Sequence, residues 1–557
     1  MNALLLRLLL FALLLASSSA SVAGGSPTTN DSAPTLRVFI FAGQSNMVGS
    51  DSKAKDIQRF APFRGLDEPQ PDVRFHYCIG REEKNESEGW VDLAPVRGVV
   101  GPELSFARAV GQHTDGPIAI IKVAAGGTTL GEDWNPNEPG GFKLYPLALR
   151  RVREALAELD SKRVKYVIEG FAWHQGENDM FNAEFKSAYA KNLANFMASW
   201  RRDLEVPELH FYVGELCTKT VWGMDNRTNM YAIDGAQREV TDADPNATYV
   251  PTSHVGVEIG GQTGLHYHYG TLGQLQHGES HAEAYLAVAG RAPARERELK
   301  KWPYREGAPL KLFVLAGHRN MEGERAFTAD LDSLRGQKKL GKDDPSIAYR
   351  YDLGGGFRVS DGWEPMGPAG FSASFGPELS FAAELRRARQ GPFAVAKFTH
   401  SGSQMVDWTP EGSDAKRRNL YPGFVAFVKE SIASLEAKGH AVELAGIVYH
   451  MGENDMAWGP FRRDAAKHLG EFVVASRKDL GLPELLWLVS QQDPMVGNSE
   501  GAFDAVAAVE AVAAADPNLV HVKAFDLPGR EQALVITTPG IIELGKRLAT
   551  NFLALKR

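Results

Sequence analysis

Short apolar, β-branched runs alternate with longer amphipathic stretches along the first half of the chain. Two of these stretches, Leu144–Leu159 and Ala183–Trp200, carry apolar residues at helical spacing and predict helices. Strands that alternate with helices favour a parallel sheet covered on both faces, so we predict an α/β fold. The expected strands are Val38–Ala42, Ile118–Val123, Tyr166–Trp173, Leu209–Gly214 and Thr248–Pro251, and a last helix is expected at about Leu275–Ala289.

The second half of the chain repeats the first at an offset near 275 residues. The heptapeptide GPELSFA at 101–107 returns unchanged at 376–382, and WHQGENDM at 173–180 returns as YHMGENDM at 449–456. This conserved order predicts two tandem copies of one domain, each too long for a solenoid repeat. The second copy's expected strands are Leu312–Ala316, Phe393–Phe398, Gly446–Tyr449, Leu485–Val489 and Val520–Ala524.

The ends of the two copies are marked by changes in composition. A charged stretch with prolines and no apolar periodicity at 291–309 predicts a linker between domains at 35–290 and 310–557. At the N-terminus, an apolar run followed by small residues predicts a secretory signal peptide at 1–23 and a linker at 24–34. A transmembrane anchor is disfavoured because the apolar run is shorter than the roughly 20 residues of a span. We therefore expect export to the periplasm or the medium, with no membrane association after cleavage.

Composition excludes some classes of partner. Of the 557 residues, 23% are charged and the formal net charge is −8, with no basic patch, which argues against nucleic acid. The only cysteines are Cys78 and Cys217, which can pair only if the fold brings them together. No zinc-ligand spacing accompanies them, so no structural metal is expected. Nothing in the composition specifies an oligomeric state.

Three predicted strands end in residues suited to catalysis. Ser45 follows the first strand in GQSNM, where open α/β sheets bind ligands, although a serine there can also simply cap a helix. The second strand ends in AAGGTT, whose Gly126 and Gly127 can present N–H donors. The third ends in HQGEND, where Gln175 can direct an amide N–H₂ into the same crevice. Nucleophile and oxyanion donors would then converge at one sheet edge.

A histidine-containing segment, GLHYHYGTLGQ at 264–274, precedes the last expected helix. His268 or His266 could return to the first strand's end and act as general base to Ser45. The alternative is two surface histidines without a catalytic role. His174 and Glu177 are spaced for a metal, but no third ligand is evident, so we expect none.

The second copy provides an internal control. It has Arg319 in place of Ser45 and Met451 in place of Gln175, and Ser401-Gly402 replaces the glycine pair. Aligning Gly273 with Gly540 puts Val535 opposite His268. Positions that are lost together indicate a shared function, so we predict a catalytically silent second copy. The retained residues Glu177 and Asp179 are then expected to serve the fold.

The set GQSNM, AAGGTT, WHQGEND and HYGTLGQ resembles the SGNH hydrolase superfamily and, more closely, the sialate O-acetylesterase domain group that includes family 6 carbohydrate esterases. The resemblance covers about 35–290 and, in degenerate form, 310–557. It implies two flavodoxin-like three-layer α/β/α domains, each with a mainly parallel sheet. It also implies a serine esterase for acetylated carbohydrate, sialate or another glycan, with no metal or cofactor.

The same resemblance assigns roles to residues. Ser45 would be the nucleophile and His268 the base, with His266 as the alternate. The Ser45 N–H, the Gly127 N–H and the Gln175 side chain would form the oxyanion hole, with Gly126 as an alternate donor. The family's aspartate, three residues before the histidine, is absent, because Leu265 (or Thr263, if His266 is the base) stands there. Glu258, Glu279 or a backbone carbonyl are the candidate substitutes.

A protein of another class fits some of these features. A non-catalytic glycan-binding protein would explain the silent copy and the missing acid, with tryptophans stacking on sugar rings. The candidates for stacking are Trp90, Trp134, Trp363 and Trp408, although core packing is the favoured role for each of them. In either class, we expect the second copy to pack against the first and to shape its cleft.

Overall fold

The computed structural model describes residues 34–83, 85–216, 226–257, 268–292, 297–415, 418–457, 459–491, 504–531 and 535–555. The predicted signal peptide lies outside these residues, and so does Cys217, whereas Cys78 is buried with a free thiol. Within the described ranges, no helix combines the length and the apolar character needed to cross a bilayer. Residues Thr35–Arg557 form one compact unit that contains both copies.

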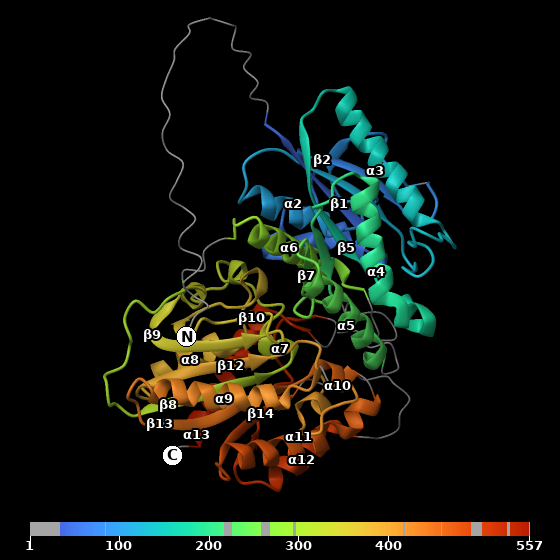
Figure 1. Ribbon diagram of the computed structural model, residues 1–557. Helices are drawn as coiled ribbons and strands as arrows, with labels where there is room; N and C mark the ends of the chain where they lie inside the picture. The colour runs from blue at the N-terminus through green and yellow to red at the C-terminus, as the bar shows by residue number, and fades with distance from the viewer. Residues whose placement is uncertain are drawn as a thin grey trace, which may run out of the picture. The chain divides into compact units, whose positions relative to one another are not determined.

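The first copy is built on a seven-stranded sheet in the order β3-β2-β4-β1-β5-β6-β7 (Figure 1). All neighbouring strands are parallel except β2 and β3. The strands are β1 Leu36–Gly43, β2 Gln70–Ile79, β3 Val91–Leu93, β4 Ile118–Ala124, β5 Tyr166–His174, β6 Phe211–Gly214 and β7 Ala247–Val250. The helices are α1 Ser45–Val48, α2 Glu103–Gly111, α3 Leu144–Ser161, α4 Ala183–Asp203, α5 Arg227–Ala243 and α6 Gly270–Val288.

The central strand β1 is buried on both faces because helices cover the sheet on each side. Val38, Ile40 and Ala42 pack in one apolar cluster with residues of α3, α4 and α5. Phe39 and Phe41 pack in another with residues of α2 and α6. Alternation of side chains along a strand therefore produces the three layers expected from the sequence.

The second copy repeats this plan in an eight-stranded sheet, in which β8 holds the place of β1 (Figure 1). Its strands are β8 Leu310–Gly317, β9 Asp344–Leu353, β10 Arg358–Val359, β11 Glu364–Met366, β12 Phe393–Thr399, β13 Val442–Met451, β14 Trp487–Gln491 and β15 Leu519–His521, with a separate hairpin of β16 Arg530–Glu531 and β17 Val535–Ile536. The helices are α7 Arg319–Glu322, α8 Glu378–Arg387, α9 Tyr421–Glu436, α10 Glu453–Ala457, α11 Gly459–Leu480, α12 Ala505–Ala514 and α13 Thr538–Ala554. The predicted fold, two α/β/α domains with mainly parallel sheets, is confirmed.

Several details differ from the sequence-based prediction; for example, β15 ends at His521, three residues before the predicted Ala524. Strand β2 was not expected, because it begins with polar residues and a proline and lacks a continuous apolar run. Helix α6 begins at Gly270, five residues before the predicted Leu275, because the glycine-rich segment GTLGQ is buried against the sheet despite its composition. The earlier start leaves His268 two residues before a helix.

The unchanged motif GPELSFA supplies one half of a buried ion pair in each copy. In the first copy, Lys122 Nζ lies 2.7 Å from Glu103 and also donates to the backbone oxygen of Val48 at 3.3 Å. In the second copy, Lys397 makes the equivalent bond to Glu378 at 2.8 Å. Because each pair ties the turn after the central strand to the neighbouring strand, the motif serves the fold in both copies.

Candidate active site

The end of β1 places Ser45 at the carboxyl edge of the sheet. Gly43 has φ +152°, and a Cβ there would lie 2.1 Å from the backbone oxygen of His174, so only glycine lets β1 run this close to β5. The Gln44 N–H donates to that same oxygen at 3.0 Å. Ser45 then begins the short helix α1 and is 8% exposed. A nearly buried serine is thus fixed at a strand end, as the sequence predicts.

The glycine loop after β4 lies directly beside Ser45. Ala125 N–H donates to Gly43 O at 3.0 Å, and a methyl group added at Gly126 would lie 3.5 Å from Ser45 Cβ. Arg81 donates to Gly126 O at 2.9 Å and to Gly127 O at 3.2 Å. In a trans peptide the N–H points opposite to the carbonyl, so Arg81 directs the Gly127 N–H away from itself. The sequence analysis missed Arg81, which follows an unpredicted strand.

Gln175 does not lie as expected of an oxyanion donor. Its side chain is fully buried, and its amide Nε2 donates to Thr128 O at 2.9 Å and to Asp179 Oδ2 at 2.5 Å. An amide nitrogen has two hydrogens, and these two bonds use both. In this arrangement Gln175 supports the backbone of the glycine loop from behind, and the expected direct role is corrected.

His268 lies beside the serine-bearing turn and contacts a carboxylate there. The N–H of the next residue, Tyr269, donates to Asn46 Oδ1 at 3.1 Å. His268 Nδ1 lies 2.7 Å from Asp51 Oδ2, and since a carboxylate accepts, Nδ1 donates. This tautomer assigns the basic nitrogen to Nε2, as in serine hydrolase triads. His268 and Asp51 therefore lie in contact with each other beside the turn that carries Ser45.

Asp51 is a candidate orienting acid that the sequence-based prediction did not include. Asp51 lies six residues after Ser45 in a left-handed conformation with φ +62°. Of the substitutes considered, Glu279 accepts instead from Ser372 Oγ at 2.6 Å, and burial raises its pKa to about 7. Glu258 and the alternate base His266 lie outside the described residues. The candidate acid therefore follows the serine in the chain, and not the histidine.

Two residues retained in both copies, Glu177 and Asp179, make buried hydrogen bonds to the serine turn and to the loop after β4. Glu177 Oε1 accepts from Asn46 Nδ2 at 2.8 Å and lies 3.6 Å from His174 Nε2. Burial would raise the pKa of Glu177, but contacts from His174 and Asn46 lower it below its ordinary value. Asp179 accepts from the N–H groups of Leu130 and Gly131. No group of three potential metal-ligating side chains occurs within the part of the chain that the structure describes.

Equivalent hydrogen bonds show which residues of the second copy correspond to the site. The Ile536 N–H donates to Asn320 Oδ1 at 3.0 Å, in the same way as the Tyr269 N–H donates to Asn46 Oδ1, so Val535 occupies the position of His268. The helices α1 and α7 both end at a left-handed glycine, four residues after Ser45 and Arg319. The same spacing puts Arg325 at the position of Asp51. Serine, histidine and acid are thus all replaced in the second copy.

The tryptophans proposed as sugar platforms serve the core. Trp134 and Trp408 are fully buried, and Trp363 is 9% exposed. Trp90 is half-buried and donates to the backbone oxygen of Ala155 at 3.1 Å. Three of the four are therefore core residues, and the half-buried Trp90 packs at the edge of the same core as Trp134.

Two α/β/α domains, the first with a serine, a histidine and a carboxylate at one sheet edge, have the framework of a hydrolase. A family model described as "Carbohydrate esterase, sialic acid-specific acetylesterase" matches residues 35–287 and 309–554. The chain belongs to this carbohydrate esterase family and contains its domain twice in tandem.

Individual relatives have related descriptions. A probable carbohydrate esterase of Arabidopsis thaliana is 28% identical over 209 residues, which cover 33% of this chain and 74% of the relative. An Arabidopsis crystal structure covers 46% of this chain and 99% of its own, at 21% identity and a TM-score of 0.35. A carbohydrate acetylesterase of Xanthomonas citri covers 45% of this chain and 56% of its own, at 17% identity and a TM-score of 0.34.

Proposed function

We propose that the protein is an exported serine acetylesterase of carbohydrates whose first copy performs the chemistry. The observation that carries this proposal is the 2.7 Å contact of His268 with Asp51 beside the turn that carries Ser45. The replacement of all three residues in the second copy supports a shared role for them. Membership of the carbohydrate esterase family supports the ester as the bond cleaved.

The mechanism follows from the positions of these groups. Asp51 accepts the Nδ1–H of His268 and holds the ring, so that Nε2 takes the proton as Ser45 Oγ attacks the acetyl carbonyl carbon. The N–H groups of Ser45 and Gly127 stabilise the oxyanion, with the Gly126 N–H as the alternate donor. The sugar oxygen leaves with the proton from His268, and water attacks the acyl-enzyme and releases acetate. The proposed mechanism uses no metal or cofactor.

The proposed substrate is an acetylated carbohydrate, either a sialate or another glycan. Acetate release from p-nitrophenyl acetate and from a panel of acetylated sialates and plant glycans tests this, with wild type beside Ser45→Ala. Release that depends on Ser45 supports an esterase, and the panel ranks the substrates. A folded wild-type protein that releases no acetate from any of them contradicts the proposal and favours a glycan-binding role.

Export forms a separate part of the proposal and rests on the apolar and small residues at 1–23. Expression of the full chain in a secreting host, followed by intact mass measurement, tests it. We expect a mature protein that begins after Ala20 or Ala23 in the periplasm or medium. Retention of the full-length chain in the cytosol would contradict export without affecting the proposed chemistry.

A further inference from the structure

The three former triad positions of the second copy lie against the first copy. Arg319, Arg325 and Val535 line one cavity together with Val257 and Tyr269 of the first copy. Val257 directly precedes the segment 258–267, and Tyr269 directly follows His268. The degenerate centre of the second copy therefore lies against Val257 and against Tyr269, the residue next to His268, of the first copy.

Arg319 makes the most direct of these contacts. Its guanidinium is buried, and Nη1 donates to the backbone oxygen of Val257 at 2.9 Å. Its Nε lies 3.4 Å from Glu324 Oε2, which also accepts from Ser401 Oγ at 2.7 Å. Glu324 and Ser401 thus hold the arginine on the second copy, and the bond to Val257 extends that anchor to the first.

Packing continues the connection from Val257 to His268. Val257 forms a separate apolar cluster with Val255 and Tyr269, the residue next to His268. Gly256 N–H donates to Gln276 Oε1 on α6 at 2.7 Å, and a Cβ on Gly273 would lie 1.9 Å from Gly256 O. A displacement of Val257 would therefore move the packing on which the His268–Tyr269 turn rests.

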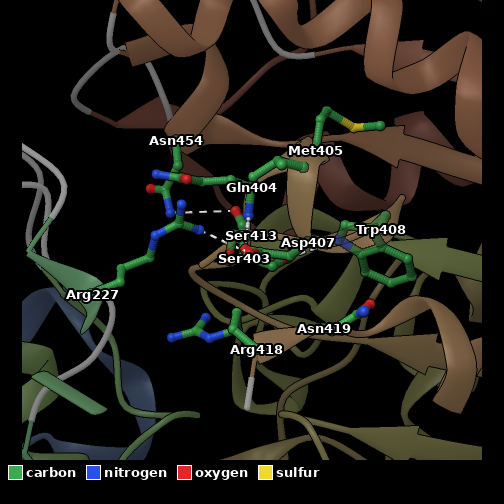
Figure 2. A network of polar contacts seen from close by, with 12 residues as sticks. Arg227, Ser403, Gln404, Met405, Asp407, Trp408, Ser413, Arg418, Asn419 and Asn454 are labelled. Carbon is green, nitrogen blue, oxygen red and sulfur yellow. Dashed lines mark hydrogen bonds and ion pairs between the residues drawn. The ribbon is translucent and has the colours of Figure 1, made fainter. Parts of the chain in front are cut away.

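Further contacts with the second copy hold the same stretch and its surroundings. Ser253 Oγ donates to Gly354 O at 3.0 Å, and the His254 ring stacks on Phe357 with centroids 3.4 Å apart. Figure 2 shows a second buried arginine, Arg227 of α5, whose Nη1 lies 2.8 Å from Asp407 Oδ1 in the second copy. The two copies are thus connected by a hydrogen bond, a ring stack and a buried ion pair.

We infer that the second copy's former catalytic centre now supports the His268–Tyr269 turn of the first copy, and that Arg319 is a positioning residue for His268. The inference rests on the proposed function of Ser45 and His268. In this role the second copy contributes to the reaction of the first through Arg319, the residue that stands in place of Ser45.

The test compares Arg319→Met with wild type in p-nitrophenyl acetate hydrolysis and in the rate of fluorophosphonate labelling. We expect kcat and the labelling rate to fall by roughly 10- to 100-fold, since a misplacement of about 1 Å can cost that much, while KM changes little. Arg319→Lys, which can still donate to Val257 O, should recover part of the rate. Hydrogen exchange at 252–257 and 268–272 should increase in Arg319→Met.

Two further variants keep the test decisive. Arg319→Met/Glu324→Gln removes both charges of the pair, so it should fold even where the single variant is unstable, and it should lose rate equally. Arg358→Met is the matched control, because it breaks another bond between the copies, to Glu283 at 3.1 Å on α6, and should keep the wild-type rate. A double variant as active as this control overturns the inference. A wild-type enzyme whose activity does not require Ser45 overturns the proposed function instead.

Discussion

The ends of β1 and β8 have the same backbone but different chemistry. Gly43 and Gly317 share φ values of +152° and +145°, and each strand is followed by a four-residue helix. The buried lysine–glutamate pair is present behind both turns. What differs is the set of side chains at the three triad positions. The comparison indicates that the buried pairs serve the fold common to both copies, whereas the side chains at the three candidate positions are free to differ.

The largest effect on the difference between the two copies is expected when the proposed nucleophile of the first copy is removed. Ser45→Ala should lower kcat by about 10⁴-fold or more, because no other residue replaces the acyl acceptor. Steady-state hydrolysis of p-nitrophenyl acetate measures this, with an unchanged melting temperature as the control for folding. Residual activity above a few per cent would indicate that a residue other than Ser45 carries the reaction.

Removing the acid tests the relocated partner of His268. Asp51→Asn should lower kcat by roughly 10²- to 10⁴-fold, since an amide in this place favours the wrong histidine tautomer. The smaller end of the range reflects the 52% exposure of the Asp51 side chain. Asp67→Asn, at a half-buried carboxylate that accepts from Gln58, is the control and should be as active as wild type. Equal rates for the two variants would remove Asp51 from the site.

The shared ion pair predicts equal effects in the two copies. Lys122→Met leaves Glu103 buried without its partner and should cost about 3–5 kcal/mol of stability, and Lys397→Met should do the same through Glu378. Thermal and urea unfolding of both variants measure the loss. Lys122→Met/Glu103→Gln should be less harmful than Lys122→Met alone. A large effect in only one copy would argue against a common structural role.

The smallest predicted effect concerns pH at the contact between the copies. Burial raises the pKa of Glu279 to about 7, with Glu283 raising it further and Ser372, Arg108 and Arg358 opposing. A carboxyl whose folded pKa is raised stabilises the fold while protonated, and that contribution is lost as the pH rises through about 7. The melting temperature should therefore fall by a few degrees between about pH 6 and pH 8.

Glu279→Gln, which stays neutral, is the comparison for that pH effect. Its melting temperature should change less than that of wild type over the same interval. Identical pH dependence in the two proteins would show that the contact of Glu279 with Ser372 does not titrate in this range.

The sequence predicted those features that depend on short stretches of chain. The apolar run at β1 and the repeat at a constant offset were enough for the fold, and GQSNM located Ser45. The partner of His268 was not predictable, because Asp51 is distant in sequence and reaches the ring only through a left-handed turn. The orientation of Gln175 was also not predictable, because Thr128 O and Asp179 come within hydrogen-bond distance of its amide only in the folded core.

The central claim, one working centre and one converted to support, is tested most directly by labelling the intact protein with a fluorophosphonate and mapping the modified peptide. The account predicts a single modification at Ser45 and none in 310–557. It also predicts that Asp51→Asn slows the labelling, whereas Asp67→Asn does not. A folded protein that takes up no label, or one labelled at a residue other than Ser45, would contradict it.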